Sequence, residues 1–233
     1  MPLAAIAALL ADPTRAAFCT ALLDGRAWTG GELARYAGVS PSTASEQLSR
    51  LVAGGLLTEE RQGRHRYVRL AGPAVASLIE DLIAYAESAP VPSPLPPPRG
   101  LRASGRANAE ARARTCYDHL AGQLGVAVAD ALVARGLVAD DSGLAVTGAG
   151  RSWFTGLGIE LSAVKGTRPL VRGCLDWTER RQHLAGALGA AFCGRAFEQR
   201  WVERIGSGRA LRVTPDGRRA FDELLGIDLT DAA

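Results

Sequence analysis

The chain is poor in aromatic residues, in histidine and in lysine. Phe, Trp and Tyr make up 6% of its 233 residues, three residues are His, and Lys165 is the single lysine. Hydrophobic residues nevertheless reach 47% and are mostly leucine, alanine and valine. This composition favours helices that pack through aliphatic side chains.

Long hydrophobic runs are also missing. None approaches the roughly 20 apolar residues that a membrane span needs. The apolar start, residues 1–10, has no basic leader, so we expect a packing helix there rather than a signal peptide. Without a secretory segment, the four cysteines predict reduced thiols and a cytoplasmic protein; they are Cys19, Cys116, Cys174 and Cys193.

The sequence lacks the motifs of common enzymes. It has no glycine-rich phosphate loop, no HExxH pair and no GxSxG nucleophile elbow. Cys174 with His183 imitates a nucleophile and its base, but this pair alone does not predict an enzyme. We therefore expect a protein that is not an enzyme and that needs no cofactor.

The formal net charge is +3, and nearly all of the basic side chains are arginine. Arginine suits bidentate contacts to phosphate and guanine, and a basic chain is compatible with a polyanionic partner. A GC-rich genome would produce the same preference for arginine, so this composition alone does not identify DNA as the partner.

Six prolines between residues 90 and 98 divide the chain. Such a stretch cannot be helical and is expected to run as an extended, semi-rigid spacer. We predict an N-terminal domain over residues 1–88, a linker over 89–99 and a C-terminal domain over 100–233.

The N-terminal segment carries the pattern of a helix-turn-helix followed by a β-hairpin. Ser40 with Pro41 is a helix start, and it follows a short helix that ends at the turn Gly38-Val39. Gly54-Gly55 ends the second helix. A strand, a tight basic turn and a second strand follow over residues 56–70, and residues 73–87 have the apolar spacing of a last helix.

Two features of this segment are suited to DNA. The second helix presents small hydroxyl side chains near its N-terminus, where free N–H groups and the helix dipole favour phosphate. The hairpin tip carries arginines that fit against the backbone or in the minor groove. The predicted DNA-binding residues are Ser40, Ser42, Thr43, Ser45, Glu46, Gln47, Arg50, Arg61, Arg64, His65 and Arg66. The plainer alternative is a helical hairpin with a solvated polar face.

Residues of about 10–86 resemble the ArsR-type winged helix-turn-helix transcriptional repressors. The resemblance rests on Asp12-Pro13-Thr14-Arg15, Glu32-Leu33-Ala34, the run from Ser42 to Leu51, Gly54-Gly55-Leu56-Leu57 and the run from Gly63 to Leu70. It implies a homodimer formed by the first helix and the helix after the wing. It also implies two recognition helices in successive major grooves of a palindromic operator, and repression that is relieved by an effector.

The chain departs from the metal-sensing members of that family. Some place cysteines in the first helix of the helix-turn-helix, where this chain reads Leu33-Ala34-Arg35-Tyr36. Others place Asp and His on the last helix, and here residues 78–85 contain no His. Neither familiar metal site is present, so the resemblance does not extend to metal sensing.

The C-terminal segment contains an internal repeat. His119-Leu120-Ala121-Gly122 recurs as His183-Leu184-Ala185-Gly186, and later positions match at nearly the same offset. We predict that each copy, over about 115–160 and 174–228, forms helices, a β-hairpin and a short helix. Because 11 residues separate Gly125 from Gly136, against 17 between Gly38 and Gly55, we interpret the copies as shortened, degenerate winged helices with a sensing or assembly role. The predicted fold class is mainly α with small β-hairpins.

The repeat brings two Cys/His sets into correspondence, and the candidate regulatory residues are Cys116, His119, Cys174, Asp176, Trp177 and His183. Two Cys and two His suit tetrahedral zinc, although the spacing is unlike a compact zinc module. A thiol switch and buried, inert cysteines remain open, and so does a pocket for an apolar ligand, lined by Trp153, Phe154, Trp177 and Phe192.

The sequence thus predicts a regulator that binds double-stranded DNA as a homodimer and responds to a small-molecule effector. The alternative function is a metal- or thiol-redox sensor in which the cysteines and histidines define the activity. A third hypothesis is an architectural protein that coats DNA with both halves, using the arginines of the second repeat: Arg200, Arg204, Arg209 and Arg212.

Overall fold

The computed structural model describes residues 2–62, 65–88, 101–140, 144–161, 168–206 and 208–229. The chain forms two compact units, Met1–Ile79 and Glu80–Ala233. The predicted proline-rich linker lies outside the described residues. The boundary between the compact units falls earlier, inside a helix, and the predicted domain limits stay a prediction.

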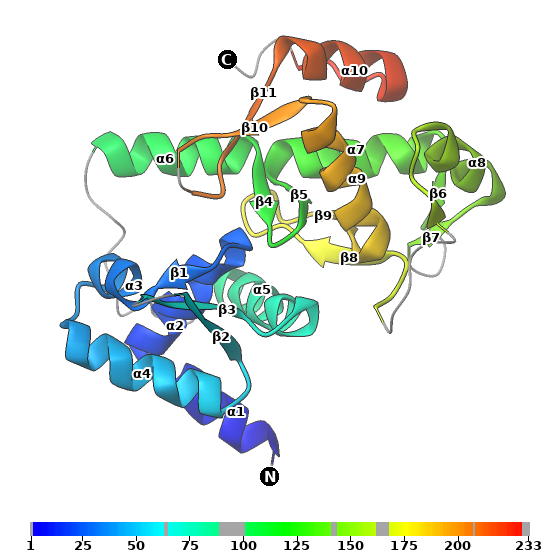
Figure 1. Cartoon of the computed structure of the whole chain (residues 1–233). Coiled ribbons are helices and arrows are strands. Elements are labelled where there is room, and N and C mark those ends of the chain that lie inside the picture. Colours follow the sequence, from blue (N-terminus) through cyan, green and yellow to red (C-terminus); the bar gives the residue numbers. More distant parts are fainter. Residues whose placement is uncertain are drawn as a thin grey trace. The chain divides into compact units, whose positions relative to one another are not determined.

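The N-terminal unit is a winged helix-turn-helix (Figure 1). Its elements are α1 (Pro2–Leu10), α2 (Pro13–Ala21), the 3-10 turn η1 (Leu22–Asp24), β1 (Trp28–Thr29), α3 (Gly30–Ala37), α4 (Pro41–Ala53), β2 (Leu57–Gln62), β3 (His65–Leu70) and α5 (Pro73–Ser88). The strands form one antiparallel sheet in the order β1-β3-β2. The short strand β1 is the element that the sequence analysis did not predict.

Local capping explains where the two central helices begin. Thr29 and Glu32 form a reciprocal capping box at α3, with the Glu32 carboxylate accepting from the Thr29 backbone N–H at 2.7 Å. Gly38, with φ +67°, ends that helix in the left-handed conformation. The Ser40 hydroxyl then accepts from the backbone N–H of Thr43 at 3.1 Å and starts α4.

Arg15 ties three helices of this unit together. Its guanidinium donates to the carbonyl oxygens of Ala8 and Leu9 at the end of α1, and to the side-chain oxygen of Gln47 on α4. Asp12 caps the helix that carries it. These bonds satisfy carbonyl groups that a helix end leaves without partners, so the Asp12–Arg15 motif positions α1 and α4 around α2.

The described part of the C-terminal unit contains helices and four short antiparallel strand pairs, which confirms the mainly α fold class with small hairpins. Its elements after α5 are α6 (Leu101–Arg112), β4 (Arg114–Cys116), β5 (His119–Ala121), α7 (Gly122–Ala134), β6 (Val138–Ala139), β7 (Ala145–Val146), α8 (Gly148–Gly156), β8 (Arg172–Leu175), β9 (Gln182–Ala185), α9 (Gly186–Glu198), β10 (Val202–Arg204), β11 (Leu211–Val213) and α10 (Pro215–Leu225).

The order hairpin, helix, hairpin, helix occurs twice in this unit. Each copy opens on a β-hairpin where the sequence analysis expected a helix. The expected shortening is also wrong, because α7 and α9 have 13 residues, the same length as α4. What removes them from a groove-reading role is burial: seven residues of α7 are buried, whereas three of α4 are.

The two copies exchange contacts, so that the hairpin of one packs on the helix of the other. Helix α7 lies against β9, and α9 lies against β5. Gly125 and Gly189 permit this approach. A Cβ at Gly125 would lie 3.6 Å from His183 Cβ of the other copy, and one at Gly189 would lie 3.3 Å from His119 Cβ. Within their own copy these Cβ atoms would lie 2.5 Å from the Leu120 carbonyl oxygen and 2.4 Å from that of Leu184. Neither position has room for a side chain.

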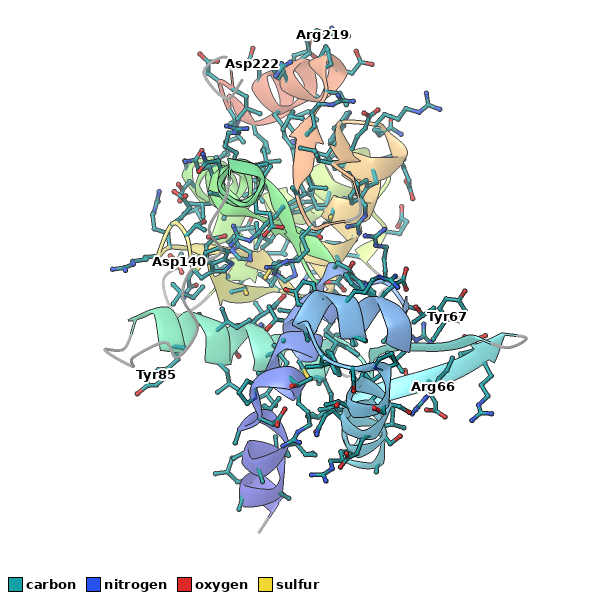
Figure 2. All side chains as sticks on the ribbon, turned by 90° about the vertical axis from the view of Figure 1, so that its left-hand side faces the viewer. Arg66, Tyr67, Tyr85, Asp140, Arg219 and Asp222 are labelled. Carbon is teal, nitrogen blue, oxygen red and sulfur yellow. The ribbon has the colours of Figure 1, made fainter. Side chains whose placement is uncertain are left out.

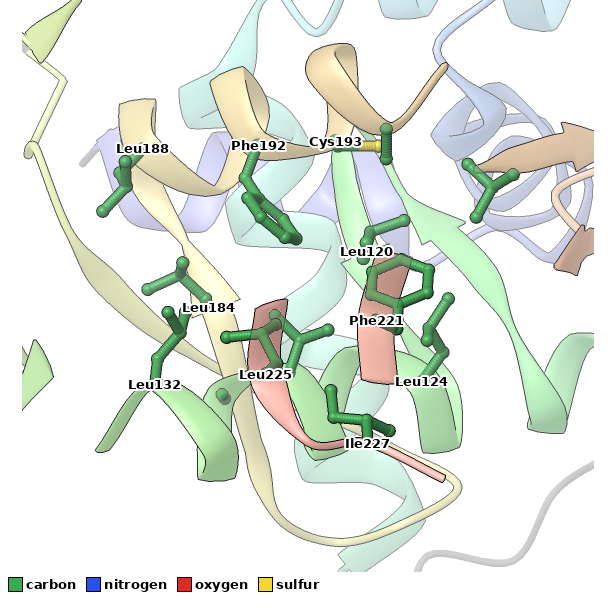
Figure 3. Packing of buried hydrophobic residues seen from close by; sticks show 14 of the residues in the cluster. Leu120, Leu124, Leu132, Leu184, Leu188, Phe192, Cys193, Phe221, Leu225 and Ile227 are labelled. Atoms are coloured by element: carbon green, nitrogen blue, oxygen red, sulfur yellow. The ribbon is translucent and has the colours of Figure 1, made fainter. Parts of the chain in front are cut away.

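The core of this unit is aliphatic with a few aromatic rings (Figure 3). Phe192, Phe221, Leu132 and Leu188 are at most 2% exposed. The core therefore joins the two copies into one packed body. The hairpins β4–β5 and β8–β9, which begin the two copies, lie at the border of this core and carry polar residues.

The helices that the structure describes are short or bent. No single one is long and apolar enough to cross a bilayer; one pair, Leu3–Leu10 with Pro13–Asp24, passes together by length and composition but is bent by 89°.

Candidate functional site

The first candidate site is the outward side of α4 with the hairpin β2–β3. Ala44, Leu48 and Leu51 are buried on the inner side of α4. The polar side chains between them are exposed, as the helical period requires; they are Ser42, Ser45, Glu46, Ser49 and Arg50. The structure thus leaves a polar surface at the N-terminal half of the helix, where an anion is favoured.

Two predicted DNA-binding residues already have protein partners. Arg50 pairs with Glu46 one turn earlier on α4, with 2.7 Å between Nη2 and Oε1. Both side chains are more than half exposed, so the pair contributes little and can open for a phosphate. Arg66, labelled on the wing hairpin in Figure 2, pairs with Glu59. It also donates to the Ser49 hydroxyl at 3.3 Å, which ties the wing to α4.

Gln47 is not on the polar surface. It is half-buried, and its side-chain oxygen accepts a hydrogen bond from Arg15 at 2.5 Å. The adenine contact predicted for it depends on a groove-facing side chain, and the structure directs it to α2 instead. The reason is its position in the helical period, one residue before buried Leu48.

The wing tip is partly described. Arg61 pairs across the hairpin with Arg66, and Gln62 with His65. Arg61 is exposed. Arg64, predicted to contact DNA, lies outside the described residues, and for His65 the strand position is described but not the side chain.

The second candidate site lies where the first hairpins of the two copies meet in the C-terminal unit. Cys116 is the cross-strand partner of His119 in the hairpin β4–β5, and Cys174 is the partner of His183 in β8–β9. One potential ligand atom from each of the four side chains lies within 4.8 Å of the others, and all four residues are buried. The structure therefore brings together the four residues that the repeat placed in correspondence.

The two imidazoles face each other in this cluster. The Nε2 atoms of His119 and His183 are 3.1 Å apart. A carboxylate lies near the other nitrogen of each ring. His119 Nδ1 is 3.3 Å from Asp118 Oδ1, and His183 Nδ1 is 3.3 Å from Asp176 Oδ2. The second contact is not aligned for a hydrogen bond. A carboxylate behind each histidine is the usual outer arrangement of a metal-binding imidazole.

Both carboxylates are held as anions by arginine. Arg168 makes two hydrogen bonds to Asp118, at 2.5 and 2.9 Å. Burial alone would raise the pKa of Asp118, but these bonds lower it to about 2. Asp176 is fully buried and accepts from Arg114, Thr178 and the Gly122 backbone N–H. Its pKa is also lowered, because these donors and His183 outweigh the effect of burial.

The sulfur atoms have one further neighbour, Glu80 on α5. The Cys116 thiol donates to Glu80 Oε1 at 2.8 Å, and Cys174 Sγ lies 3.7 Å from Oε2. Burial raises the pKa of Glu80 to about 7. Hydrogen bonds from Cys116 and the two histidines lower the pKa of Cys174. The hydrogen bond to Cys174, together with burial, raises the pKa of Cys116. This is a polar pocket that favours one thiolate.

The other residues predicted for the C-terminal site have different places. Trp177 is half-buried, and the guanidinium carbon of Arg114 lies over its ring, 4.8 Å from the ring centroid. Phe154 and Phe192 are buried and pack edge to face with centroids 6.3 Å apart, and Trp153 lies beside them. These three are core residues, so the structure does not gather the four aromatic residues around one ligand pocket.

Sequence reasoning did not select Glu80, Arg114, Asp118 or Arg168. Asp118 had a signal, since it directly precedes His119, although Gln182 stands at the matching position before His183. Glu80 had a weaker one, an acidic residue within the apolar spacing of the last helix. Arg114 and Arg168 had none, because their partners are fixed by tertiary packing.

Comparisons with known proteins agree with this architecture. A family model described as a helix-turn-helix domain matches residues 10–60. The uncharacterized HTH-type transcriptional regulator YdfF of Bacillus subtilis is 41% identical over 229 residues, covering 97% of this chain and 98% of its own. The HTH-type transcriptional regulator CmtR of Mycobacterium tuberculosis is 37% identical over 81 residues, which cover 35% of this chain and 68% of CmtR.

Two solution structures are also similar to the N-terminal part. One is the homodimeric winged helix-turn-helix domain of Mb0332 from Mycobacterium bovis, a possible ArsR-family regulator, with 28% identity, a TM-score of 0.35 and coverage of 39% of this chain and 82% of that one. The other is the cadmium sensor CmtR from Mycobacterium tuberculosis, with 33% identity, a TM-score of 0.33 and coverage of 40% and 94%.

Proposed function

Because the chain belongs to the HTH-type transcriptional regulators, we propose that it is a homodimeric repressor that binds a palindromic operator and is released from it by an effector. The winged helix-turn-helix and the DNA-binding role agree with the resemblance to the ArsR-type regulators. The dimer, the palindrome, the repression and the effector are the proposal. In it the protein acts in the cytoplasm and has no enzymatic activity.

The observation that carries the proposal is the exposed polar side of α4. Ser42, Ser45 and Glu46 are exposed in its N-terminal half, while the opposite side of the helix is buried. Helix α4 has 13 residues; its inner face packs on the rest of the unit, and its polar face is exposed to solvent. This is the geometry of a recognition helix. Arg66 fixes the wing beside it through Ser49.

Exposed apolar residues support self-association. Helix α1 is apolar along its length, yet Leu3 is 77% exposed. On α5, Leu82 is 45% and Tyr85 68% exposed. Apolar surface of this kind is characteristic of protein interfaces, and α1 and α5 are the helices through which the resemblance implies dimerisation.

The proposal is tested by fluorescence anisotropy on promoter fragments from the neighbouring genes, in competition with random duplex. Arg61→Ala and Arg64→Ala are expected to weaken specific and random DNA alike, each reducing the salt slope by about 1. Ser45→Ala and Glu46→Gln are expected to change the preference at particular bases, by about 1–3 kcal/mol per altered contact. Arg219→Ala, an exposed arginine of α10, is the control for the loss of one charge.

Two outcomes would contradict the proposal. One is the absence of binding to any promoter duplex at low salt. The other is an equal loss from the wing variants, the α4 variants and Arg219→Ala, since this would mean non-specific attraction by net charge. A sharp footprint at one operator would also separate a regulator from a protein that coats DNA.

A further inference from the structure

We propose that the C-terminal unit contains one tetrahedral site for Zn²⁺ or a closely related thiophilic divalent ion, formed by four side chains: Cys116, His119, Cys174 and His183. This inference does not depend on the DNA-binding proposal, because it concerns a separate part of the chain and is tested by metal binding alone.

The separation of the four atoms suits one ion. Zinc lies about 2.3 Å from sulfur and 2.0–2.1 Å from nitrogen, so ligand atoms around it are about 3.3–3.8 Å apart. The cluster lies within 4.8 Å, and the two Nε2 atoms are 3.1 Å apart. A contraction of the sulfur atoms by about 1 Å, within reach of side-chain rotation, completes the tetrahedron.

The two imidazoles place their Nε2 atoms where one cation can bind both. If each Nδ1 carries the proton and faces its carboxylate, Asp118 or Asp176, both Nε2 lone pairs point at each other across 3.1 Å. Without an ion, one Nε2–H donates a hydrogen bond to the other nitrogen; with both protons on Nδ1, the two Nε2 lone pairs are available to one cation. Asp118, which is hydrogen-bonded to His119 Nδ1, is held by Arg168, and Asp176, which lies beside His183 Nδ1, is held by Arg114, so both carboxylates are in place before an ion arrives.

The hairpins supply this geometry by symmetry. Each copy contributes one Cys and one His as cross-strand neighbours, and the two hairpins meet because Gly125 and Gly189 let each helix approach the other copy's histidine strand. A Cβ at Gly189 would lie 3.3 Å from His119 Cβ, and one at Gly125 would lie 3.6 Å from His183 Cβ. The ion would therefore cross-link the two copies.

The donor set decides the class of ion. Two sulfur and two nitrogen donors select zinc and similar ions over the oxygen-preferring Mg²⁺ and Ca²⁺. Four protein ligands leave no open position, and the residues are at most 4% exposed, so the site is of the closed type rather than the catalytic type. The same burial argues against a peroxide-sensing thiol, which needs solvent access.

Glu80 gives occupancy a consequence outside the site. The Cys116 thiol donates a hydrogen bond to Glu80 Oε1 at 2.8 Å. A thiolate bound to an ion has lost this proton and can no longer donate. Loading the site therefore removes the hydrogen bond that holds the Glu80 carboxylate, and Glu80 belongs to α5. We infer that α5 responds to the ion through this one side chain.

The test is a titration of the reduced, metal-free full chain with Co²⁺, followed by displacement with Zn²⁺. We expect one ion per chain, a sulfur-to-cobalt charge-transfer band and the strong visible bands of a tetrahedral ion. Cys116→Ser and Cys174→Ser are expected to weaken binding at least 100-fold and to reduce the charge-transfer band. Cys193→Ser removes a thiol that is equally buried but lies in the apolar core, and it is expected to keep one ion.

Folding of each variant is checked by circular dichroism, and the wild-type spectrum alone is decisive if the serine variants do not fold. An octahedral cobalt spectrum, or less than one bound ion at equimolar metal, would overturn the proposal. So would Cys193→Ser losing the band as Cys116→Ser does. A Cys116–Cys174 disulfide that forms on mild oxidation of a chain that binds no metal would assign the pair to redox chemistry instead.

Discussion

Arg114 donates a hydrogen bond to Asp176 at 2.9 Å, and both side chains are completely buried. The same carboxylate accepts from the Gly122 backbone N–H at 2.7 Å and faces His183. This ion pair thus joins β4 of the first copy to the loop of the hairpin β8–β9 of the second, directly behind one imidazole of the candidate metal site.

Breaking this pair is expected to destabilise the C-terminal unit strongly. Asp176→Asn leaves the Arg114 guanidinium buried without its counter-charge, which typically costs about 3–5 kcal/mol. The free energy of unfolding by urea measures the loss. Asp216→Asn breaks the exposed pair with Arg219 and serves as the control, with a change of at most about 0.5 kcal/mol. An equal loss of unfolding free energy in the two variants would show that the buried Arg114 guanidinium does not need Asp176 as its counter-charge.

The tight packing of α9 on the strand that precedes it makes a second prediction. Gly189→Ala places a Cβ 2.4 Å from the Leu184 carbonyl oxygen, and overpacking of this kind costs about 1–3 kcal/mol. Gly194→Ala, in the same helix α9, meets nothing within 4 Å and is expected to stabilise by about 0.5–1 kcal/mol, because alanine is the better helix former. Thermal unfolding distinguishes the two, and a stabilising Gly189→Ala would contradict the packing.

The outer carboxylates make a third prediction, which depends on the metal proposal. Asp118→Asn keeps the shape of the side chain but weakens the orientation of His119, and such changes typically lower metal affinity 10–100-fold. Competition with a chelator measures the affinity. Asp130→Asn breaks an exposed pair with Arg181 and is expected to leave the affinity unchanged. If Asp130→Asn lowered the metal affinity and Asp118→Asn did not, the role given to Asp118 in orienting His119 would be wrong.

Glu80 makes a fourth prediction, which rests on both proposals. The operator affinity of the wild-type chain is expected to change when one equivalent of Zn²⁺ is added, and Glu80→Gln is expected to reduce that change while still binding one ion. Anisotropy measured with and without the ion tests this. If Glu80→Gln binds no ion, Glu80 is a ligand rather than a relay; if the response to Zn²⁺ is undiminished, α5 is not coupled through it.

Gln47 makes a fifth prediction. Because its side-chain oxygen accepts from the Arg15 guanidinium, Gln47→Ala is expected to lower the stability of the N-terminal unit by about 1–2 kcal/mol without a change in base preference. Ser45→Ala, on the exposed side of α4, is expected to do the opposite. A changed preference in a fully stable Gln47→Ala would restore the groove contact that the structure argues against.

Much of the N-terminal unit was predictable from local signals. Ser40 with Pro41, Gly38 and the paired Gly54-Gly55 mark helix ends through interactions within a few residues, and α4 runs from Pro41 to Ala53 as expected. The hairpin β2–β3 also followed from its turn. The short strand β1 was missed because two residues carry no period, and its pairing of Trp28 with Val68 is a long-range contact.

The C-terminal unit was less predictable. The repeat was visible in the His-Leu-Ala-Gly motif, but the hairpin that opens each copy has strands too short to show an alternating pattern, so a helix was expected in its place. The repeat correctly related Cys116 to Cys174 and His119 to His183. Glu80, Arg114 and Arg168 could not be assigned to the site, because their partners Cys116, Asp176 and Asp118 lie 36, 62 and 50 residues away in the sequence.

The amino-acid sequence alone determined the winged helix-turn-helix, since capping, turn chemistry and apolar period act over a few residues and specify each element locally. It also determined which Cys and His residues correspond, since a repeat carries that information along the chain. Only the tertiary structure decided that α7 and α9 are buried rather than groove-reading, that Gln47 faces Arg15, and that four ligand atoms converge beside Glu80. These outcomes depend on which surfaces pack together, and packing is a property of residues that are far apart in the sequence.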